Sequence, residues 1–391
     1  MKILHVISSV NPGNGGPIEG IKQLALANQA FGHSIEVASL DAPDAACLRS
    51  LDIPVHALGP GRWKYRYSSR MVPWLRENAR RFDVVIVNGL WQYHGFAVWR
   101  ALRKSKTPYV VYTHGMLDPW FKKTYPLKHL KKLLYWPWAE YRILRDAGAV
   151  LFTCEEERVL ARQSFNTYKC NEVVVNYGTA GPQGNAQAGV EQFYSRFPEL
   201  RNKRIAIFLG RLHEKKGCDL LIQAFARELA SDPEWHLLIC GPDQVGWQAS
   251  LQAMAAQLGI ADRITWAGMI TGNLKWGALF SSEIFVLPSH QENFGIVVAE
   301  ALACGVPALI SDKVNIWQEV QADGAGIAGP DTLEGTCATL KTWKNMSSQQ
   351  KTGMRARTGE CFEQRFEIHA AARTLIAALE SVCARRAAQR P

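Results

Sequence analysis

Short, almost wholly apolar runs alternate along the chain with longer segments whose apolar residues recur every three to four positions. Apolar runs bounded by glycine are typical of parallel β-strands that helices cover on both faces. The pattern therefore predicts an α/β protein built from βαβ units. We expect its strands at 3–8, 34–40, 83–88, 109–114 and 149–154 in the first half, and at 204–210, 236–241, 263–268, 283–289 and 307–311 in the second.

Each half of the chain opens with a strand, a glycine-bearing loop and an amphipathic helix, although the halves share no detectable sequence repeat. We therefore expect two Rossmann-like domains that face each other across a central cleft, where the ligand binds. The expected division is an N-terminal domain at 1–180, a small and polar linker at 181–203, a C-terminal domain at 204–365, and an alanine-rich last helix at 366–391.

Composition narrows the class of protein. The 391 residues are 47% hydrophobic and 20% charged, as in ordinary globular proteins, which argues against disorder. The nine cysteines lie far apart without a C-x-x-C pair, so we expect no disulfides and no metal site, and a cytoplasmic location. We interpret the apolar N-terminus as a strand rather than a signal peptide, and no apolar run is long enough to span a bilayer. The net charge of +10 indicates an anionic partner: a phosphorylated ligand, nucleic acid or a membrane surface.

Loops beyond the carboxyl ends of parallel strands are the first candidates for a ligand site. The loop and helix start at 11–20 read NPGNGGPIEG, which lacks the third glycine of the dinucleotide-binding fingerprint. Its glycines still allow backbone N–H groups to approach an anion at a helix N-terminus. A tight strand-to-helix turn is the alternative interpretation.

A second candidate loop, 210–217, reads GRLHEKKG between a predicted strand and a predicted helix. The planar guanidinium of Arg211 and the ammonium of Lys216 are suited to holding a diphosphate without a metal. A solvated basic turn would have the same composition.

The third candidate, 288–307, reads PSHQENFGIVVAEALACGVP. Glu292 lies in the loop, and Glu300 lies within an otherwise apolar helix. Amides at a helix N-terminus suit phosphate oxygens, and a carboxylate suits sugar hydroxyls. Burial of Glu300 requires a partner; the alternative is that its side chain reaches the surface or caps a neighbouring element.

The motif G-R-L-x-x-x-K-G, followed by E-N-F-G-x-x-x-x-E-A-x-A-x-G-x-P, resembles retaining glycosyltransferases of family 4, which have the GT-B fold. The resemblance extends over the whole chain, and its most specific element is the spacing of Glu292 and Glu300. The segment HGMLDPW at 114–120 is similar to a subgroup found in bacterial exopolysaccharide and surface-polysaccharide synthesis.

The resemblance implies a set of site residues. Arg211 and Lys216 match the pair that neutralises the donor diphosphate, and Glu300 matches the residue that binds the nucleotide ribose. Glu292 and His114 match groups near the donor sugar, so these two, with Arg211 and Lys216, are the expected catalytic residues. The other expected donor contacts are Gly15, Gly16, Met269, Asn293, Phe294, Gly295 and Ile296. The last helix is expected to cross back onto the N-terminal domain.

The expected mechanism needs no metal or other cofactor, because the chain lacks the D-x-D motif that binds a metal-bound diphosphate in GT-A enzymes. The resemblance implies departure of the diphosphate and attack of the acceptor on the same face of the sugar, and thus retention of the anomeric configuration. His114 is not proposed as a nucleophile; a capping or core histidine is its alternative role. We expect a UDP-sugar donor, with UDP-glucose, UDP-GlcNAc and GDP-mannose left open.

The segment 120–138, WFKKTYPLKHLKKLLYWPW, combines lysines with aromatic residues, and after Pro126 it has the pattern of a basic amphipathic helix. Such helices suit the interface of an anionic membrane, where a lipid-pyrophosphate-linked glycan acceptor would be presented. A solvated helix face over an aromatic core is the alternative. The expected membrane and acceptor surface comprises Trp63, Arg66, Trp120, Lys122, Lys123, Lys128, Lys131 and Lys132.

Three other functions remain open. A nucleotide-sugar 2-epimerase shares the fold, but its own motifs are not evident. A nucleic-acid-binding protein is suggested by charge, although the aromatic residues follow no RRM, KH or OB pattern. A catalytically inactive scaffold is opposed by the intact charged residues of both loops.

Overall fold

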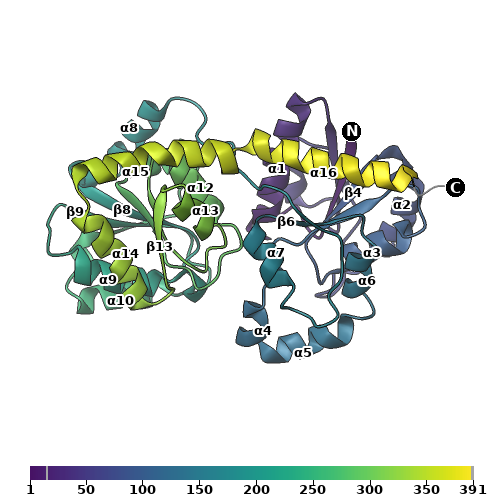
Figure 1. Ribbon diagram of the computed structural model, residues 1–391, viewed down its shortest axis with the longest axis horizontal. Coiled ribbons are helices and arrows are strands. Elements are labelled where there is room, and N and C mark those ends of the chain that lie inside the picture. Colours follow the sequence, from purple (N-terminus) through teal and green to yellow (C-terminus); the bar gives the residue numbers. More distant parts are fainter. Residues whose placement is uncertain (15, 389–391) are drawn as a thin grey trace. The chain divides into compact units, whose positions relative to one another are not determined.

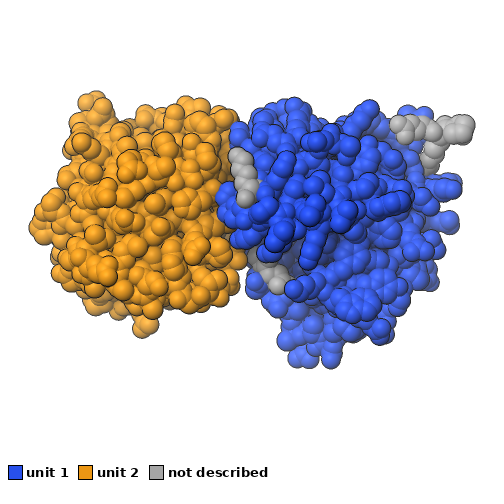
Figure 2. Space-filling view, turned by 90° about the horizontal axis from the view of Figure 1, so that it is seen from below, with its two compact units in different colours: residues 1–178, 368–391 blue, residues 179–367 orange. Residues whose placement is uncertain are grey.

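The structure is a computed structural model that describes residues 1–14 and 16–388; the predicted donor contact Gly15 lies outside the described residues. The described chain forms two compact units, one made of residues 1–178 and 368–388 and the other of 179–367 (Figures 1 and 2). The α/β class and the Rossmann-like architecture of both units are confirmed.

The first unit is built on a parallel sheet with the strand order β3-β2-β1-β4-β5-β6-β7. Side chains such as Leu4, Val6, Val85 and Val87 are fully buried because helices cover both faces of the sheet. The strands are β1 Lys2–Ile7, β2 Ser34–Ser39, β3 Val55–Ala57, β4 Val84–Asn88, β5 Tyr109–Tyr112, β6 Val150–Phe152 and β7 Glu172–Val174. The helices are α1 Gly16–Ala30, α2 Met71–Asn78, α3 Tyr93–Leu102, α4 Trp120–Thr124, α5 Pro126–Tyr135, α6 Glu140–Arg145, α7 Glu155–Ala161 and α16 Ile368–Ala388.

The second unit is built on a parallel sheet with the order β10-β9-β8-β11-β12-β13. Its strands are β8 Arg204–Leu209, β9 Trp235–Cys240, β10 Ile264–Gly268, β11 Ile284–Leu287, β12 Ala308–Ser311 and β13 Gly326–Gly329. Its helices are α8 Ala186–Arg196, α9 Cys218–Glu228, α10 Gln248–Gln257, α11 Gly272–Phe280, α12 Ile296–Ala303, α13 Trp317–Ala322, α14 Leu333–Asn345 and α15 Ser348–Cys361.

The last helix, α16, belongs to the first unit and packs along α1 (Figure 1). Its apolar positions Leu375, Leu379 and Val382 are almost fully buried. Near its end, Arg386 donates from Nη2 to the carbonyl of Ser105 at 2.8 Å. The C-terminal segment therefore completes the N-terminal unit.

The prediction of a linker at 181–203 is wrong for most of that segment. Residues Ala186–Arg196 form α8, which begins at Asn185, whose side chain caps the amides of Gln187 and Ala188. The helix packs closely on α11, because Gly189 and Gly277 bring the two backbones together: a Cβ on Gly277 would lie 2.0 Å from the carbonyl oxygen of Gly189. A glycine that is typical of a linker in the sequence here makes a helix–helix contact.

Candidate active site

The loop after β8 carries Arg211 and Lys216 at the carboxyl edge of the second sheet. A short turn at Glu214–Lys216 brings the chain round, and Gly217 completes it with a φ of 66°. A Cβ at Gly217 would lie 2.1 Å from the carbonyl oxygen of Pro288, so only glycine allows this approach to the loop after β11. The backbone of His290 also donates to the carbonyl of Lys215 at 2.8 Å. The two candidate loops are thus joined through their backbones.

Lys216 and Glu292 meet where these loops join. The ammonium of Lys216 forms an ion pair with Oε2 of Glu292, and both side chains are largely buried. Burial, together with the positive charges of Lys215 and Arg211, lowers the pKa of Lys216 to about 7. A buried ammonium group whose neighbours are also positively charged attracts an anion. This position therefore suits a phosphate group.

Arg211 differs from Lys216 in that its side chain is exposed. Its Nη1 atom lies 3.4 Å from Oε1 of Gln244, and no carboxylate among the described residues pairs with it. The guanidinium is therefore available to a ligand at the same loop.

Glu292 is fixed by the backbone on both sides. Its amide donates to the carbonyl of Lys313 at 2.9 Å, and its carbonyl accepts from the amide of Asn315 at 3.1 Å. Helix α12 then begins at Ile296, with Gly295 as its N-cap residue at a φ of 75°. Phe294, just before the helix, is buried and packs edge-on against Phe366.

The structure answers the question raised by a glutamate in an apolar helix. Glu300 is only 6% exposed, and its Oε1 atom accepts from Nζ of Lys275 at 2.7 Å. Lys275, on α11, also lies 4.0 Å from the ring centroid of Trp276. The surface alternative for Glu300 is therefore wrong. No sequence pattern indicated a role for Lys275. It lies on α11 and pairs with a residue of α12, and strand β11 separates these two helices in the chain.

The predicted base contact Met269 follows β10 at the same edge of the sheet. Its side chain is 71% exposed, and Gly268 before it has a φ of 63°. The carbonyl of Gly268 accepts from the amide of Gly241 at 2.7 Å, which ties this turn to the end of β9. A large exposed apolar side chain at a fixed turn is suited to packing on a planar ring.

In the first unit, His114 follows β5 in a left-handed conformation with a φ of 48°. Its Nε2 atom lies 3.2 Å from Oδ1 of Asn88, whose amide nitrogen in turn lies 3.1 Å from Nδ1 of His5. This orientation of Asn88 requires a proton on Nε2 of His114 and leaves Nδ1 as an acceptor. Burial, and next the nearby His5, lower the pKa of His114 to about 3. The ring is neutral at physiological pH.

The strained turn at His114 is held by a buried carboxylate that sequence analysis missed. Oε1 of Glu157 accepts from the amide of Gly115 and from the hydroxyl of Thr113, both at 2.6 Å, and Oε2 accepts from the amide and hydroxyl of Thr153 at 2.7 Å. Because this glutamate lies in the EEE sequence that begins α7, it looks like a solvated charge.

A pocket of about 290 Å³ lies beside this turn, at the carboxyl ends of β1 and β4. Arg66 lines it, with Nη2 at 3.1 Å from Oδ1 of Asp41 and 3.0 Å from the carbonyl of Leu40. Arg66 therefore lines a pocket, and its partner Asp41 is buried. The other polar lining residues are Ser8, Ser9, Asn88 and Gln92. Gly16, at the start of α1, is exposed.

Helix α5 has its apolar residues on the outside. None of its residues is buried, and Leu127, Leu130 and Leu134 are 78%, 57% and 71% exposed. Trp138, just beyond the helix, is 68% exposed. We call these four residues the α5 face; Lys128 and Lys131 are exposed beside it.

The other predicted surface residues differ in how far they are exposed. Lys132 lies inward, 4.3 Å from the ring centroid of Trp91, because the helix turns this position toward the unit. Lys132 is therefore only partly exposed, whereas Lys128 and Lys131 are exposed. Trp63 is 77% exposed and Lys122 is exposed, Trp120 is half-buried, and the side chain of Lys123 lies outside the described part of the structure.

Within residues 1–14 and 16–388, no group of three or more histidine, cysteine, aspartate or glutamate side chains is arranged to hold a metal ion. Over the same residues, no helix combines the length and apolar character required to cross a membrane.

Comparison with known proteins matches each half of the chain to a glycosyltransferase domain. Residues 15–178 match the glycosyl transferase 4-like domain, and residues 191–347 match the domain of glycosyl transferases group 1. The GDP-mannose:cellobiosyl-diphosphopolyprenol alpha-mannosyltransferase of Xanthomonas campestris is 25% identical over 84% of this chain and 83% of its own. A D-inositol 3-phosphate glycosyltransferase of Geodermatophilus obscurus is 36% identical, over 32% of this chain and 29% of its own.

Solved structures share the fold. HepE of Anabaena, solved with UDP and glucose, superimposes with a TM-score of 0.77 at 18% identity, covering 97% of this chain and all of that one. Sucrose-phosphate synthase of Thermosynechococcus elongatus gives 0.75 at 17% identity, covering 98% of this chain and all of that one. The two Rossmann-like units thus make up a GT-B fold, and the chain is a hexosyltransferase of glycosyltransferase family 4.

Proposed function

We propose that the enzyme transfers a hexose from a UDP-sugar to a lipid-linked glycan acceptor in polysaccharide biosynthesis, without a metal and with retention of the anomeric configuration. The observation that carries the proposal is the grouping of Arg211, Lys216, Glu292 and the Glu300–Lys275 pair on two joined loops and a helix at one edge of the second sheet. Two cations for a diphosphate and one buried carboxylate for a ribose are the groups a nucleotide-sugar requires.

In the proposed reaction, Lys216 exchanges its contact with Glu292 for a contact with the donor diphosphate. The bond between the sugar anomeric carbon and the phosphate oxygen breaks, and the negative charge that develops on that oxygen is stabilised by Lys216 and Arg211. The acceptor hydroxyl attacks on the same face of the sugar and gives its proton to the departing phosphate. His114, neutral with Nδ1 as an acceptor, receives a hydrogen bond from a sugar hydroxyl and does not act as an acid or base.

The donor base has a second candidate. The similar mannosyltransferase that spans most of this chain is named for GDP-mannose, whereas the structural neighbour HepE was solved with UDP. The exposed Met269 packs on either base, so its position does not exclude guanine.

We assign the acceptor glycan to the pocket lined by Arg66, Asn88 and Gln92. The diphosphopolyprenol in the name of the Xanthomonas enzyme favours a lipid-linked acceptor. We further propose that the α5 face rests on an anionic membrane, since its leucines are exposed and lysines flank them. Such contact would bring the pocket close to lipid-linked substrates.

The test is a thermal-shift series with UDP, GDP and their hexose conjugates in EDTA. A ligand at 100 times its Kd adds about 2.7 kcal/mol to the free energy of unfolding, which is readily detected. We expect UDP to stabilise the protein and Arg211→Ala to abolish the effect. A shift with GDP alone would assign the enzyme to guanosine donors; no shift in EDTA that returns with Mg²⁺ would overturn metal independence. The anomeric configuration of the product, read by NMR, tests retention.

Lys275→Met is expected to raise the KM for the donor about 10-fold, with kcat lowered less. The substitution removes the 2.7 Å contact between Lys275 and Glu300, so this carboxylate is held less firmly for the ribose hydroxyls. A charged hydrogen bond contributes about 1.5–3 kcal/mol. Steady-state kinetics give the measurement, with Lys341→Met, an exposed lysine on α14, as the control. A donor KM equal to that of the wild type would show that Lys275 does not position Glu300.

A further inference from the structure

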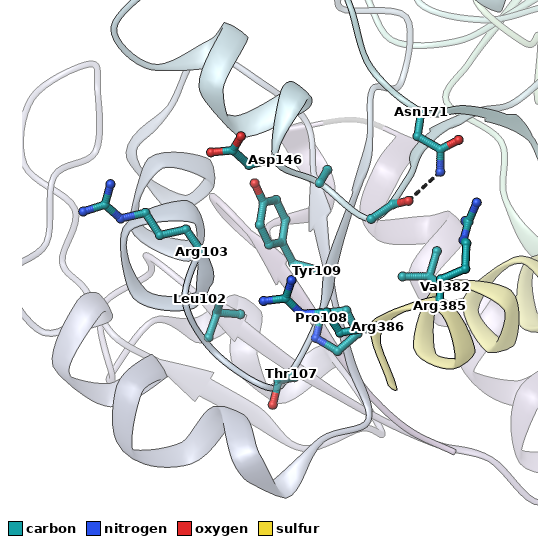
Figure 3. Close-up of a pocket in the computed structure, with 12 residues that line it drawn as sticks. Leu102, Arg103, Thr107, Pro108, Tyr109, Asp146, Asn171, Val382, Arg385 and Arg386 are labelled. Atoms are coloured by element: carbon teal, nitrogen blue, oxygen red, sulfur yellow. Dashed lines mark hydrogen bonds between the residues drawn. The ribbon is translucent and has the colours of Figure 1, made fainter. Parts of the chain in front are cut away.

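A second pocket in the first unit has features that the transfer reaction does not use. Its volume is about 280 Å³, and it lies at the amino-terminal ends of β5 and β6, the opposite edge of the sheet from the acceptor pocket. The end of α3, the loop before β6 and the last turns of α16 form its walls (Figure 3). It is thus separate from the candidate active site.

Three arginines line this pocket: Arg103, Arg385 and Arg386. Figure 3 shows Arg386 beside Pro108 and Tyr109, and Arg385 extended toward Asn171. None of the three forms an ion pair within the part of the chain that the structure describes. The three side chains extend in different directions in Figure 3, with Arg386 between the other two, so an anion in the pocket is attracted by positive charge from both sides.

The one carboxylate in the lining is already occupied. Asp146 accepts from Nε of Arg145 at 2.7 Å and from the indole nitrogen of Trp99 at 2.8 Å. The pKa of Asp146 is lowered, because these hydrogen bonds and the charges of Arg145 and Arg103 outweigh its partial burial. Its negative charge is therefore shared with Arg145, and the pocket keeps an excess of positive charge.

Two of the arginines are held in position. Arg386 is half-buried and donates from Nη2 to the carbonyl of Ser105 at 2.8 Å, and Arg103 packs its guanidinium 4.9 Å from the ring centroid of Trp99. A fixed guanidinium loses less entropy when it binds than a free one, and its planar N–H groups match two oxygens of a phosphate.

We propose that this pocket binds a phosphate group through Arg386, with the charges of Arg385 and Arg103 at its two sides adding to the attraction, and that the bound phosphate holds the end of α16 against the edge of β5. The phosphate belongs either to a soluble phosphate ester or to a phospholipid headgroup, since both present the same oxygens. The surface around the pocket is also basic, with Lys104 and Lys106 exposed in the loop that precedes β5.

The experiment measures binding of glycerol 3-phosphate by calorimetry and of phosphatidylglycerol vesicles by co-sedimentation. We expect R385Q/R386Q to weaken glycerol 3-phosphate binding about 10–100-fold, as for the loss of a charged hydrogen bond. The matched control is K104Q/K106Q, which removes the same charge beside the pocket without changing its lining. R385Q alone, at an exposed side chain, should give a smaller loss and leaves the Arg386 contact intact.

The outcomes are distinct. Loss of glycerol 3-phosphate binding in R385Q/R386Q alone supports a soluble phosphate ester, and a vesicle affinity lowered more in R385Q/R386Q than in the control supports a headgroup. Equal losses in both double variants would show only a diffuse basic surface and overturn the proposal, as would no binding of either probe by the wild type. UDP binding, measured in the same variants, is expected to be unchanged, so failure here is separable from failure of the donor site.

Discussion

Lys216→Met is expected to lower kcat for sugar transfer about 10²–10³-fold, as does the loss of one preorganised charge contact to a developing oxyanion. The ammonium is buried beside Glu292, where a fixed charge acts with little screening by water. Methionine keeps the length and apolar stem of the side chain, so the loop at 210–217 retains its packing. Steady-state rates at saturating donor give the measurement.

The control for this variant is Lys215→Met, one residue away in the same turn. Lys215 holds the loop through its backbone carbonyl, which the substitution leaves in place, so we expect kcat within a few-fold of the wild type. Equal losses in both variants would mean that general positive charge, rather than the position of Lys216, is what the reaction requires.

The pH dependence provides a second measurement on Lys216. Its pKa is lowered to about 7 in the free enzyme, and a bound diphosphate favours the protonated form, so donor binding takes up a proton when the pH exceeds 7. Affinity for a UDP-hexose, whose diphosphate has no group that titrates in this range, should therefore be constant below pH 7 and fall about tenfold per pH unit above it. Lys215→Met removes one of the positive charges that lower the pKa of Lys216. The fall in affinity should therefore begin at a higher pH in this variant. A flat profile in the wild type would show that Lys216 does not contact the diphosphate.

Strands with a continuous apolar run could be predicted from the sequence, including β10 at an edge of the second sheet, but three short edge strands could not. Every predicted strand is present, but β3, β7 and β13 were missed. These have three or four residues each, and β3 and β7 are only half-buried, so they lack the apolar run that identifies a covered strand. The prediction of a linker failed at α8 for a related reason: the helix packs on α11 through the close backbone approach of Gly189, which hydrophobic periodicity does not register.

The candidate site shows the same limit. Arg211, Lys216, Glu292 and Glu300 could be identified because each lies in a motif on a loop or helix start. Their partners could not: Lys275 meets Glu300 only after the second sheet has formed, and Glu157 looks like one of three exposed carboxylates at a helix N-terminus. Partners of this kind depend on contacts between distant elements, which one sequence does not show.

The triple variant Leu127→Ser/Leu130→Ser/Leu134→Ser is expected to lower binding to phosphatidylglycerol vesicles by at least roughly 100-fold. Complete burial of one leucine contributes about 1.5–3 kcal/mol, so even partial insertion of three leucines exceeds the 2.7 kcal/mol that corresponds to this factor. The measurement is co-sedimentation at moderate salt. Lys128→Gln/Lys131→Gln should give a smaller loss that disappears at high salt, because exposed charges are screened.

Exposure of these leucines decides how the result is interpreted. Because the side chains at 127, 130 and 134 are more than half exposed, serine there removes no core packing, and thermal unfolding should be unchanged. The control, Leu26→Ser/Leu258→Ser, changes exposed leucines on α1 and beside α10 that are not part of the α5 face, and should leave vesicle binding intact. If the triple variant still binds vesicles as the wild type does, the exposed leucines have another partner. If the control variant loses binding equally, the contact is general apolar adhesion rather than a membrane surface on α5.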